Sequence, residues 1–422
     1  MRVGLAAIAA VVLATSAVWA EDWPQWRGPT RDGISREKGL LGQWPVQGPR
    51  LLWRVQDVGY GYGSVAVAGG RVFLIGNRGL ENEFVAAHDA RTGRKLWSTR
   101  LGRVGNPNQQ PNHPGARSTP TVDGGLLYAL GSDGDLVCAD TAGGRVVWRK
   151  SLRADFGGKP GIWAYSESPL VDGNRLIVTP GGGQAAVVAL DKRSGRTLWR
   201  CSVPGTAEAG YASAVVMEAG GSRQIVQFLD TGVVGVEAAT GRLLWRFDRT
   251  VDRQYRVHAA TPLASGGLVY TSSAAGGGLA RVSRAGTEWT AEPAYLERRA
   301  PGGLGGAVLV DGHLYGTSGP SLVCVEQATG RLKWQERSVG EASVVFADGR
   351  LYLHGENGQM VLVEASPAGY RERGRFTPPD PPDRGSAKAW NCPAVANGRL
   401  YVRDLGVLWV YDIRASAEPA GR

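Results

Sequence analysis

The chain has 422 residues, of which 62 are glycine and 20% are charged, and its formal net charge is +10. This composition suits many short strands joined by tight turns and argues against a long helical bundle or a disordered chain. The basic residues form no block, which argues against a nucleic-acid partner and leaves a general attraction to acidic partners or anionic surfaces of the cell envelope.

Residues 1–20 have the pattern of a cleavable secretory signal peptide. Arg2 precedes an apolar run from Val3 to Val18, and Ala20 is a small residue just before Glu21. The run is shorter than the roughly 20 residues of a membrane span, so a retained N-terminal anchor is the less favoured alternative. No cysteine stands at the cleavage point to carry a lipid. We therefore expect a periplasmic or secreted protein with no transmembrane segment after signal cleavage.

Residues 21–49 are rich in tryptophan and proline. A run from Asp22 to Pro29 (DWPQWRGP) opens the segment, and Trp44-Pro45 lies near its end. The segment has too much proline and glycine for a helix and too much tryptophan for plain disorder. It predicts an extended N-terminal arm whose rings dock on the main domain, with a partner-binding tail as the alternative.

A turn-and-strand motif recurs through the rest of the chain, with Thr-Gly-Arg or a close variant followed by alternating residues and a tryptophan. A glycine suits the tight turn, and the ring at the end of the strand can bury against a neighbour. The tryptophans lie 44 to 51 residues apart, which is the length of a four-stranded propeller blade. They are Trp97, Trp148, Trp199, Trp245 and Trp334, with a shortened copy at Trp289 and a degenerate copy at 369–375 in which Tyr370 replaces the pattern.

Each repeat is predicted to contain four short antiparallel strands. A third-strand run such as Leu136–Asp140 precedes the motif, and two earlier runs are joined by Asp-Gly or Asn-Gly, which two-residue hairpins prefer. The motif strand around Trp53 has no such strands before it, whereas three strands near the C-terminus have no motif after them. Pairing the two ends would complete one blade and remove the open edges of the ring.

We therefore predict an all-β protein, an eight-bladed β-propeller at 50–414 whose last blade is closed by an N-terminal strand, followed by a polar tail at 415–422. The expected blades are 57–101, 115–153, 163–204, 209–249, 256–293, 302–338, 340–376, and 386–414 joined to 50–56.

The repeat resembles that of the quinoprotein-type β-propeller family, named after pyrroloquinoline quinone (PQQ). The pattern Ala-x-Asp-x-x-Thr-Gly-x-x-x-Trp from Ala87 to Trp97, and its copy from Ala189 to Trp199, carry the resemblance, which covers nearly all of the chain after residue 20. The family includes dehydrogenases that hold the quinone and calcium in the central channel, an outer-membrane assembly lipoprotein that binds proteins, and exported propellers without a settled role. The DWPQWRGP opening is most similar to the third branch. Fold alone does not choose among them.

The channel mouth is where a quinone site would lie. Alignment on the prolines that begin the first strands places Arg117, Glu167, Trp390 and Asn391 there as candidate cofactor residues, with Trp163, Tyr211, His258 and Lys388 as candidate ligand-binding residues on the rim. These side chains offer positive charge, a flat ring and oxygen ligands for calcium. The alternative is a polar, water-filled lining whose groups pair with one another, with His258 a solvated loop residue.

The resemblance also shows what the chain lacks. The adjacent cysteine pair of the alcohol-dehydrogenase branch, an aspartate base at the aligned positions and the large insertions that shape a substrate pocket are all absent. We therefore expect no catalytic residue, no metal site and no cofactor. The leading hypothesis is a monomeric, non-catalytic scaffold that binds an envelope protein or small ligand. The alternatives are a small PQQ- and calcium-dependent dehydrogenase of alcohols or sugars, and a polysaccharide-binding propeller that uses Trp163, Tyr211 and Trp390.

Overall fold

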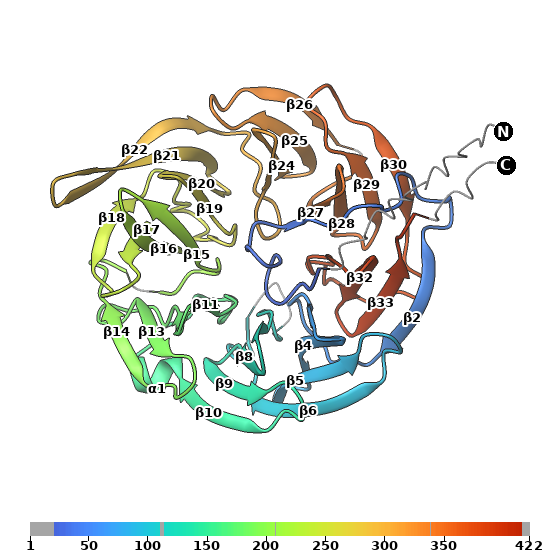
Figure 1. Cartoon of the computed structure of the whole chain (residues 1–422), viewed down its shortest axis with the longest axis horizontal. Helices are drawn as coiled ribbons and strands as arrows, with labels where there is room; N and C mark the ends of the chain where they lie inside the picture. The colour runs from blue at the N-terminus through green and yellow to red at the C-terminus, as the bar shows by residue number, and fades with distance from the viewer. Residues whose placement is uncertain (1–20, 110–113, 207, 338, 416–422) are drawn as a thin grey trace, which may run out of the picture.

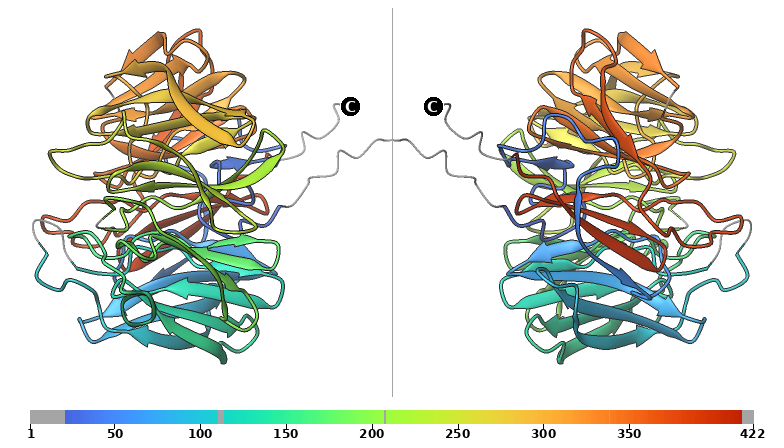
Figure 2. Two further views of the ribbon diagram at one scale, coloured as in Figure 1. Left: turned by 90° about the vertical axis from the view of Figure 1, so that its left-hand side faces the viewer. Right: turned by 90° about the vertical axis from the view of Figure 1, so that its right-hand side faces the viewer.

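Eight sheets, each with four antiparallel strands, form a closed ring in the computed structural model (Figure 1). The model describes residues 21–109, 114–206, 208–337 and 339–415. Seen from the edge, the ring is a thick disc (Figure 2). The predicted eight-bladed propeller is therefore confirmed. The predicted signal peptide at 1–20 and the tail residues 416–422 lie outside the described residues.

The blades are numbered here in chain order, and each runs from the channel outward. Blades 1 to 4 are β3 (Ala66–Ala68), β4 (Arg71–Arg78), β5 (Asn82–Asp89), β6 (Lys95–Gly102); β7 (Thr121–Asp123), β8 (Leu126–Leu130), β9 (Asp135–Asp140), β10 (Val146–Ser151); β11 (Leu170–Asp172), β12 (Arg175–Val178), β13 (Val187–Asp191), β14 (Thr197–Cys201); and β15 (Val215–Ala219), β16 (Ser222–Leu229), β17 (Gly232–Glu237), β18 (Leu243–Phe247).

Blades 5 to 8 complete the ring. They are β19 (Leu263–Ser265), β20 (Leu268–Ser273), β21 (Gly276–Ala285), β22 (Glu288–Glu297); β23 (Val308–Val310), β24 (His313–Ser318), β25 (Ser321–Glu326), β26 (Leu332–Glu336); β27 (Ala342–Ala347), β28 (Arg350–Gly355), β29 (Met360–Glu364), β30 (Glu372–Phe376); and β31 (Ala394–Ala396), β32 (Arg399–Asp404), β33 (Val407–Asp412), β2 (Arg50–Gln56). The described residues include one short helix, α1 (Leu152–Phe156).

Both ends of the chain contribute to blade 8, as predicted. Strand β2 pairs antiparallel with β33, from Arg50 opposite Asp412 to Gln56 opposite Val407. Without β2, the backbone of β33 would be an unpaired sheet edge next to blade 1. Closure therefore joins segments more than 350 residues apart in the sequence.

The recurring tryptophans hold neighbouring blades together. Each of five indole N–H groups donates to a backbone carbonyl of the next blade, and in four of the five cases the glycine of that blade's turn lies against the ring. Gly195, for example, has φ +71°, and a Cβ added to it would come within 2.9 Å of the Trp148 ring. The five bonds are Trp53–Ala90 (3.1 Å), Trp97–Thr141 (3.1 Å), Trp148–Lys192 (3.1 Å), Trp199–Ala238 (3.0 Å) and Trp334–Ser366 (2.8 Å).

Blade 5 departs from the predicted motif. Tyr295, and not Trp289, pairs with the third strand just before the bulge, opposite Leu279, and Tyr295 lies against the turn glycine of blade 6, Gly330. The prediction that Trp289 is the motif tryptophan at the seam, meaning the contact between one blade and the next, was wrong. Strands β21 and β22 have ten residues each, so their hairpin extends past the ring (Figure 1). Trp289 instead packs under the guanidinium of Arg284 on this extension.

The first part of the N-terminal arm, residues 21–37, fills the centre of the ring (Figure 1). Its backbone pairs with the innermost strands, since Trp23 bonds to Val67 and Pro24 accepts from Val122. Strand β1 (Ile34–Ser35) adds in parallel to β27, which gives blade 7 a fifth, innermost strand. The arm thus acts as a plug built from the protein's own chain.

Two buried arginines fix this plug to the channel wall. The Arg27 guanidinium donates to the carbonyls of Gly306 at 3.0 Å and Ala307, both leading into β23. The Arg31 guanidinium donates to the carbonyls of Ser168 at 2.7 Å and Pro169 at 3.0 Å, which lead into β11 of blade 3. Burial lowers the pKa of both groups, for Arg31 to about 9. Backbone carbonyls, which are strong acceptors, offset part of the cost of burying these charges.

Candidate functional site

The plug divides the channel into two cavities. The larger, called here the mouth cavity, has a volume of about 660 Å³ and is lined by the loops that enter the first strands of the blades and by loops between second and third strands. Trp26 of the arm lies on its wall, held by a hydrogen bond from the indole nitrogen to Thr261 Oγ1 at 2.9 Å. A second cavity of about 600 Å³ lies on the other side of the arm, against Gln25, Arg31 and Ile34.

Five of the eight residues proposed from the sequence line the mouth cavity. They are Arg117, Trp163, Tyr211, Lys388 and Trp390. Arg117 lies over the ring of Tyr62, 4.7 Å from its centroid, and donates to Gln109 Oε1 at 3.2 Å. Burial lowers the pKa of Arg117, and the neighbouring tyrosines act in the opposite direction.

The other three, Glu167, Asn391 and His258, are buried in the packing around the cavity. Glu167 accepts both the backbone N–H and the hydroxyl of Thr179, the latter at 2.6 Å. Burial raises the pKa of Glu167 to about 7, while the bonds from Thr179 and the charge of Arg31 lower it.

Asn391 and His258 have comparable structural roles. The Asn391 amide donates to the carbonyls of Gly61 at 3.2 Å and Gly63 at 2.8 Å, which ties blade 8 to the start of blade 1. His258 Nε2 accepts from the Asp252 backbone N–H at 3.1 Å, and burial lowers the pKa of His258 to about 4.

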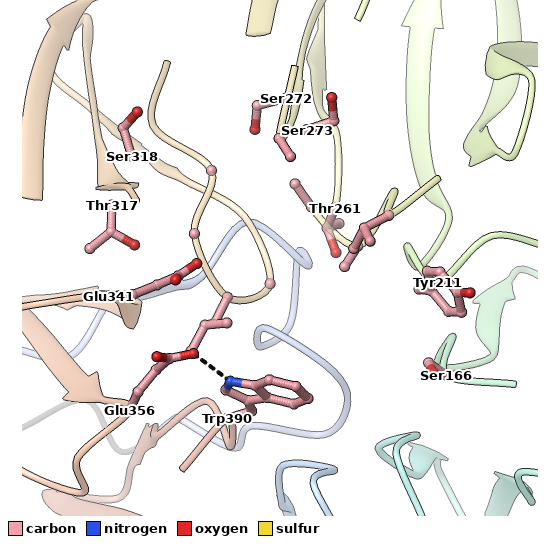
Figure 3. Close-up of a pocket in the computed structure, with 18 of the residues that line it drawn as sticks. Ser166, Tyr211, Thr261, Ser272, Ser273, Thr317, Ser318, Glu341, Glu356 and Trp390 are labelled. Carbon is pink, nitrogen blue, oxygen red and sulfur yellow. Dashed lines mark hydrogen bonds between the residues drawn. The ribbon is translucent and has the colours of Figure 1, made fainter. Parts of the chain in front are cut away.

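Sequence reasoning missed two carboxylates on the cavity wall. Glu356 accepts from the Trp390 indole at 2.7 Å (Figure 3). It also accepts from Lys388 Nζ at 2.5 Å. Glu341 lies on the same wall, and its carboxylate has no hydrogen bond to any described residue. Burial, and then the charge of Glu356, raise the pKa of Glu341, while Lys388 lowers it. Glu341 directly precedes β27 and Glu356 lies in the loop between β28 and β29, so neither was among the residues aligned on the first-strand prolines.

The residues of this site do not fit a quinone with calcium. The oxygens of Glu167 and Asn391, the two proposed calcium ligands, point into packing, where Glu167 accepts from Thr179 and the Asn391 oxygen accepts from the Leu405 backbone N–H at 3.4 Å. Trp390 is tilted at 42° against Tyr62 with centroids 5.4 Å apart, and its indole nitrogen is committed to Glu356. Within the described ranges, no three His, Cys, Asp or Glu side chains are grouped so that they could hold a metal ion.

The fold of eight four-stranded blades places the protein among the PQQ-like propellers. The model of the family described as "Outer membrane protein assembly factor BamB" matches residues 81–301 and 294–368, which together exceed half of the chain, and the chain therefore belongs to this family. In the part of the chain that the structure describes, no helix is long and apolar enough to span a bilayer.

Curated relatives match only part of this chain. The outer membrane protein assembly factor BamB of Kangiella koreensis is 29% identical over 136 residues, which is 32% of this chain and 31% of that protein. The serine/threonine-protein kinase AfsK of Streptomyces griseus is 28% identical over 170 residues, which is 39% of this chain and 19% of the kinase. The matched part is thus less than a third of the length of either relative.

Two solved structures share the fold over most of the chain. BamB from Moraxella catarrhalis superposes with a TM-score of 0.60 at 15% identity, covering 87% of this chain and 98% of that one. A quinohemoprotein alcohol dehydrogenase from Pseudomonas putida superposes with a TM-score of 0.61 at 13% identity, covering 95% of this chain and 82% of that one. At these identities the likeness concerns the fold alone.

Proposed function

We propose that this protein is an exported, non-catalytic propeller that acts as a binding scaffold in the cell envelope and holds a protein or small ligand at the mouth cavity. The observation that carries the proposal is the plug. The protein's own arm occupies the channel and leaves the mouth cavity on one side of it, with the second cavity on the other, while the side chains that a quinone enzyme would need are committed to internal hydrogen bonds.

The surroundings of the cavity support a binding role. Two of the exposed large hydrophobic side chains, Ile162 (58% exposed) and Tyr255 (62% exposed), lie on loops beside cavity residues Trp163 and Val257. Exposed apolar side chains around a concave site are common where partners or ligands bind. Membership of a family described as an assembly factor agrees with such a role. The envelope location rests on the predicted leader at 1–20.

The enzymatic alternative is tested on the purified full chain after leader removal. The protein is titrated with PQQ in the presence of calcium, and dye reduction is followed with alcohols and sugars as substrates. We expect no saturable quinone binding and no substrate-dependent dye reduction. Tight binding together with turnover would overturn the proposal and support the dehydrogenase.

The scaffold role is tested by photo-crosslinking in cells that produce the full chain. A benzophenone amino acid at Ile162 should form a discrete adduct, whereas the same group at Val46, which is 96% exposed but lies away from the cavity, should not. If both positions give the same adducts, or Ile162 gives none and no small ligand binds, the scaffold proposal fails.

A further inference from the structure

Aromatic rings line two sides of the mouth cavity. Trp163 and Tyr211 form one pair with centroids 5.5 Å apart, and Tyr62 and Trp390 form the other at 5.4 Å. Trp163, Tyr211 and Trp390 are only partly buried, so part of each ring remains accessible. Accessible rings offer flat apolar surface to a ligand at little cost in conformational entropy.

The remaining wall is polar, and some of its groups have no hydrogen-bond partner among the described residues. Glu341 stands beside Glu356 on one side of the cavity, and Ser166 lies with Tyr211 on the other (Figure 3). The hydroxyls of Ser166 and Ser318, like the Glu341 carboxylate, are partly buried and have no hydrogen bond to a described residue. Partly desolvated acceptors of this kind gain free energy when a ligand supplies donors.

Charges of both signs face the same space. Arg117, Arg298 and Lys388 bring positive charge, and Glu341 and Glu356 bring negative charge. Arg117, which already lies over Tyr62, would repel a cationic ligand. The two carboxylates would repel an anionic ligand. A hydroxyl group both donates and accepts, so a neutral ligand rich in hydroxyls can satisfy carboxylates and guanidinium together.

We propose that the mouth cavity binds a neutral oligosaccharide, with sugar faces against Trp163 and Tyr211 and sugar hydroxyls donating to Glu341. The inference rests on the proposed binding function and names its ligand class. A volume of about 660 Å³ accommodates a short oligosaccharide segment, because pockets for drug-sized ligands span about 300–1,000 Å³. Binding involves no covalent step, and the sugar leaves unchanged.

The test uses the purified full chain after leader removal. A glycan array first identifies a neutral oligosaccharide, and calorimetry then measures its affinity beside maltotriose, cellotriose and chitotriose, with spermidine and trigalacturonate as charged probes. At least one neutral oligosaccharide should bind with a Kd below about 1 mM.

Two variants and one control locate the site. Glu341→Gln should weaken binding about tenfold, because the amide nitrogen replaces one of the two carboxyl oxygens and cannot accept a hydrogen bond. Trp163→Ala should weaken it at least as much. Glu288→Gln, an exposed change on β22 far from the cavity, should leave affinity within about twofold. Thermal melts confirm that each variant is folded.

Each remaining outcome is decisive. If no neutral glycan binds, or if binding ignores both Glu341→Gln and Trp163→Ala, the inference is overturned. Selective binding of spermidine or trigalacturonate also overturns the inference but leaves the proposed binding function in place. A crosslink at Ile162 without glycan binding has the same two consequences. Oxidation of a bound sugar with dye reduction would overturn the non-catalytic function itself.

Discussion

Trp44 of the N-terminal arm lies against Gly374 of blade 7, where a Cβ on the glycine would come within 2.6 Å of the tryptophan side chain. Gly374 pairs with Leu362 just before the bulge, the position at which Trp334 stands in blade 6. The arm therefore supplies the indole that blade 7 lacks. Tyr370, which was expected to replace the motif, lies outside this position and packs against Trp334 with centroids 6.2 Å apart.

Replacing Trp44 should open the seam between blades 7 and 8. Trp44 is 4% exposed, and its ring meets Phe376 at 5.1 Å and Tyr352 at 5.8 Å. Trp44→Ala should lower the free energy of unfolding by about 3–5 kcal/mol through lost burial and a residual cavity. The control, Val46→Ala, should change it by less than about 0.5 kcal/mol, because Val46 is 96% exposed. Urea unfolding measures both, and equal effects would contradict the assigned role.

A turn glycine beneath a seam tryptophan should tolerate alanine less well than a glycine in open space. Gly195 and Gly173 have φ values of +71° and +61°, but only Gly195 lies against a ring, that of Trp148. Gly173→Ala should cost about 1–2 kcal/mol from backbone strain alone. Gly195→Ala should cost about 1–3 kcal/mol more, because the indole must move. Equal losses in denaturant melts would show that the ring contact contributes nothing.

The plug should loosen when its buried arginine is removed. Arg27→Met leaves the carbonyls of Gly306 and Ala307 without their donors, and we expect a loss of about 2–3 kcal/mol in the stability of the docked arm. Hydrogen exchange across residues 22–35 should then accelerate, while the strands of blades 2 to 5 stay protected. Arg36→Met is the control, since the Arg36 side chain is 58% exposed. Unchanged exchange in Arg27→Met would contradict the anchoring role.

Glu83 should make the fold less stable as pH rises. Burial raises the pKa of this carboxyl to about 8, helped by Asp135 and Asp133, whereas two bonds from Ser132 lower it. Between its unfolded pKa of about 4.3 and pH 8, the folded chain holds a proton that the unfolded chain has lost. Stability should therefore fall with rising pH through this range, by at most about 1.4 kcal/mol per pH unit.

The Glu83→Gln variant isolates this effect, because glutamine keeps an acceptor for Ser132 and does not ionise. The urea midpoint of Glu83→Gln minus that of the wild type should be larger at pH 8.5 than at pH 5. Glu81→Gln, an exposed change two residues away, should follow the wild type at both pH values. A Glu83→Gln protein with the wild-type pH dependence would show that Glu83 is already ionised in the fold.

Of the residues predicted to line the channel mouth, those three positions before the first-strand prolines do so, whereas those two positions before do not. Ser166 and Trp390 stand three positions before Pro169 and Pro393, which precede β11 and β31, and both line the cavity. Their immediate neighbours Glu167 and Asn391 are 3% and 0% exposed and serve packing. Successive side chains of an extended segment point to opposite sides, so a shift of one residue exchanges cavity wall for core.

The sequence by itself determined the number of blades, their four-strand pattern and the closure of blade 8, because turn glycines, alternating apolar residues and seam tryptophans are local features repeated along the chain. It did not determine the path of residues 21–49, since proline-rich chain has no periodicity that selects a partner surface. Only the tertiary structure decided that this arm fills the channel and supplies Trp44 to blade 7. The same holds for Glu341 and Glu356, which approach each other only when two loops of blade 7 meet at the mouth.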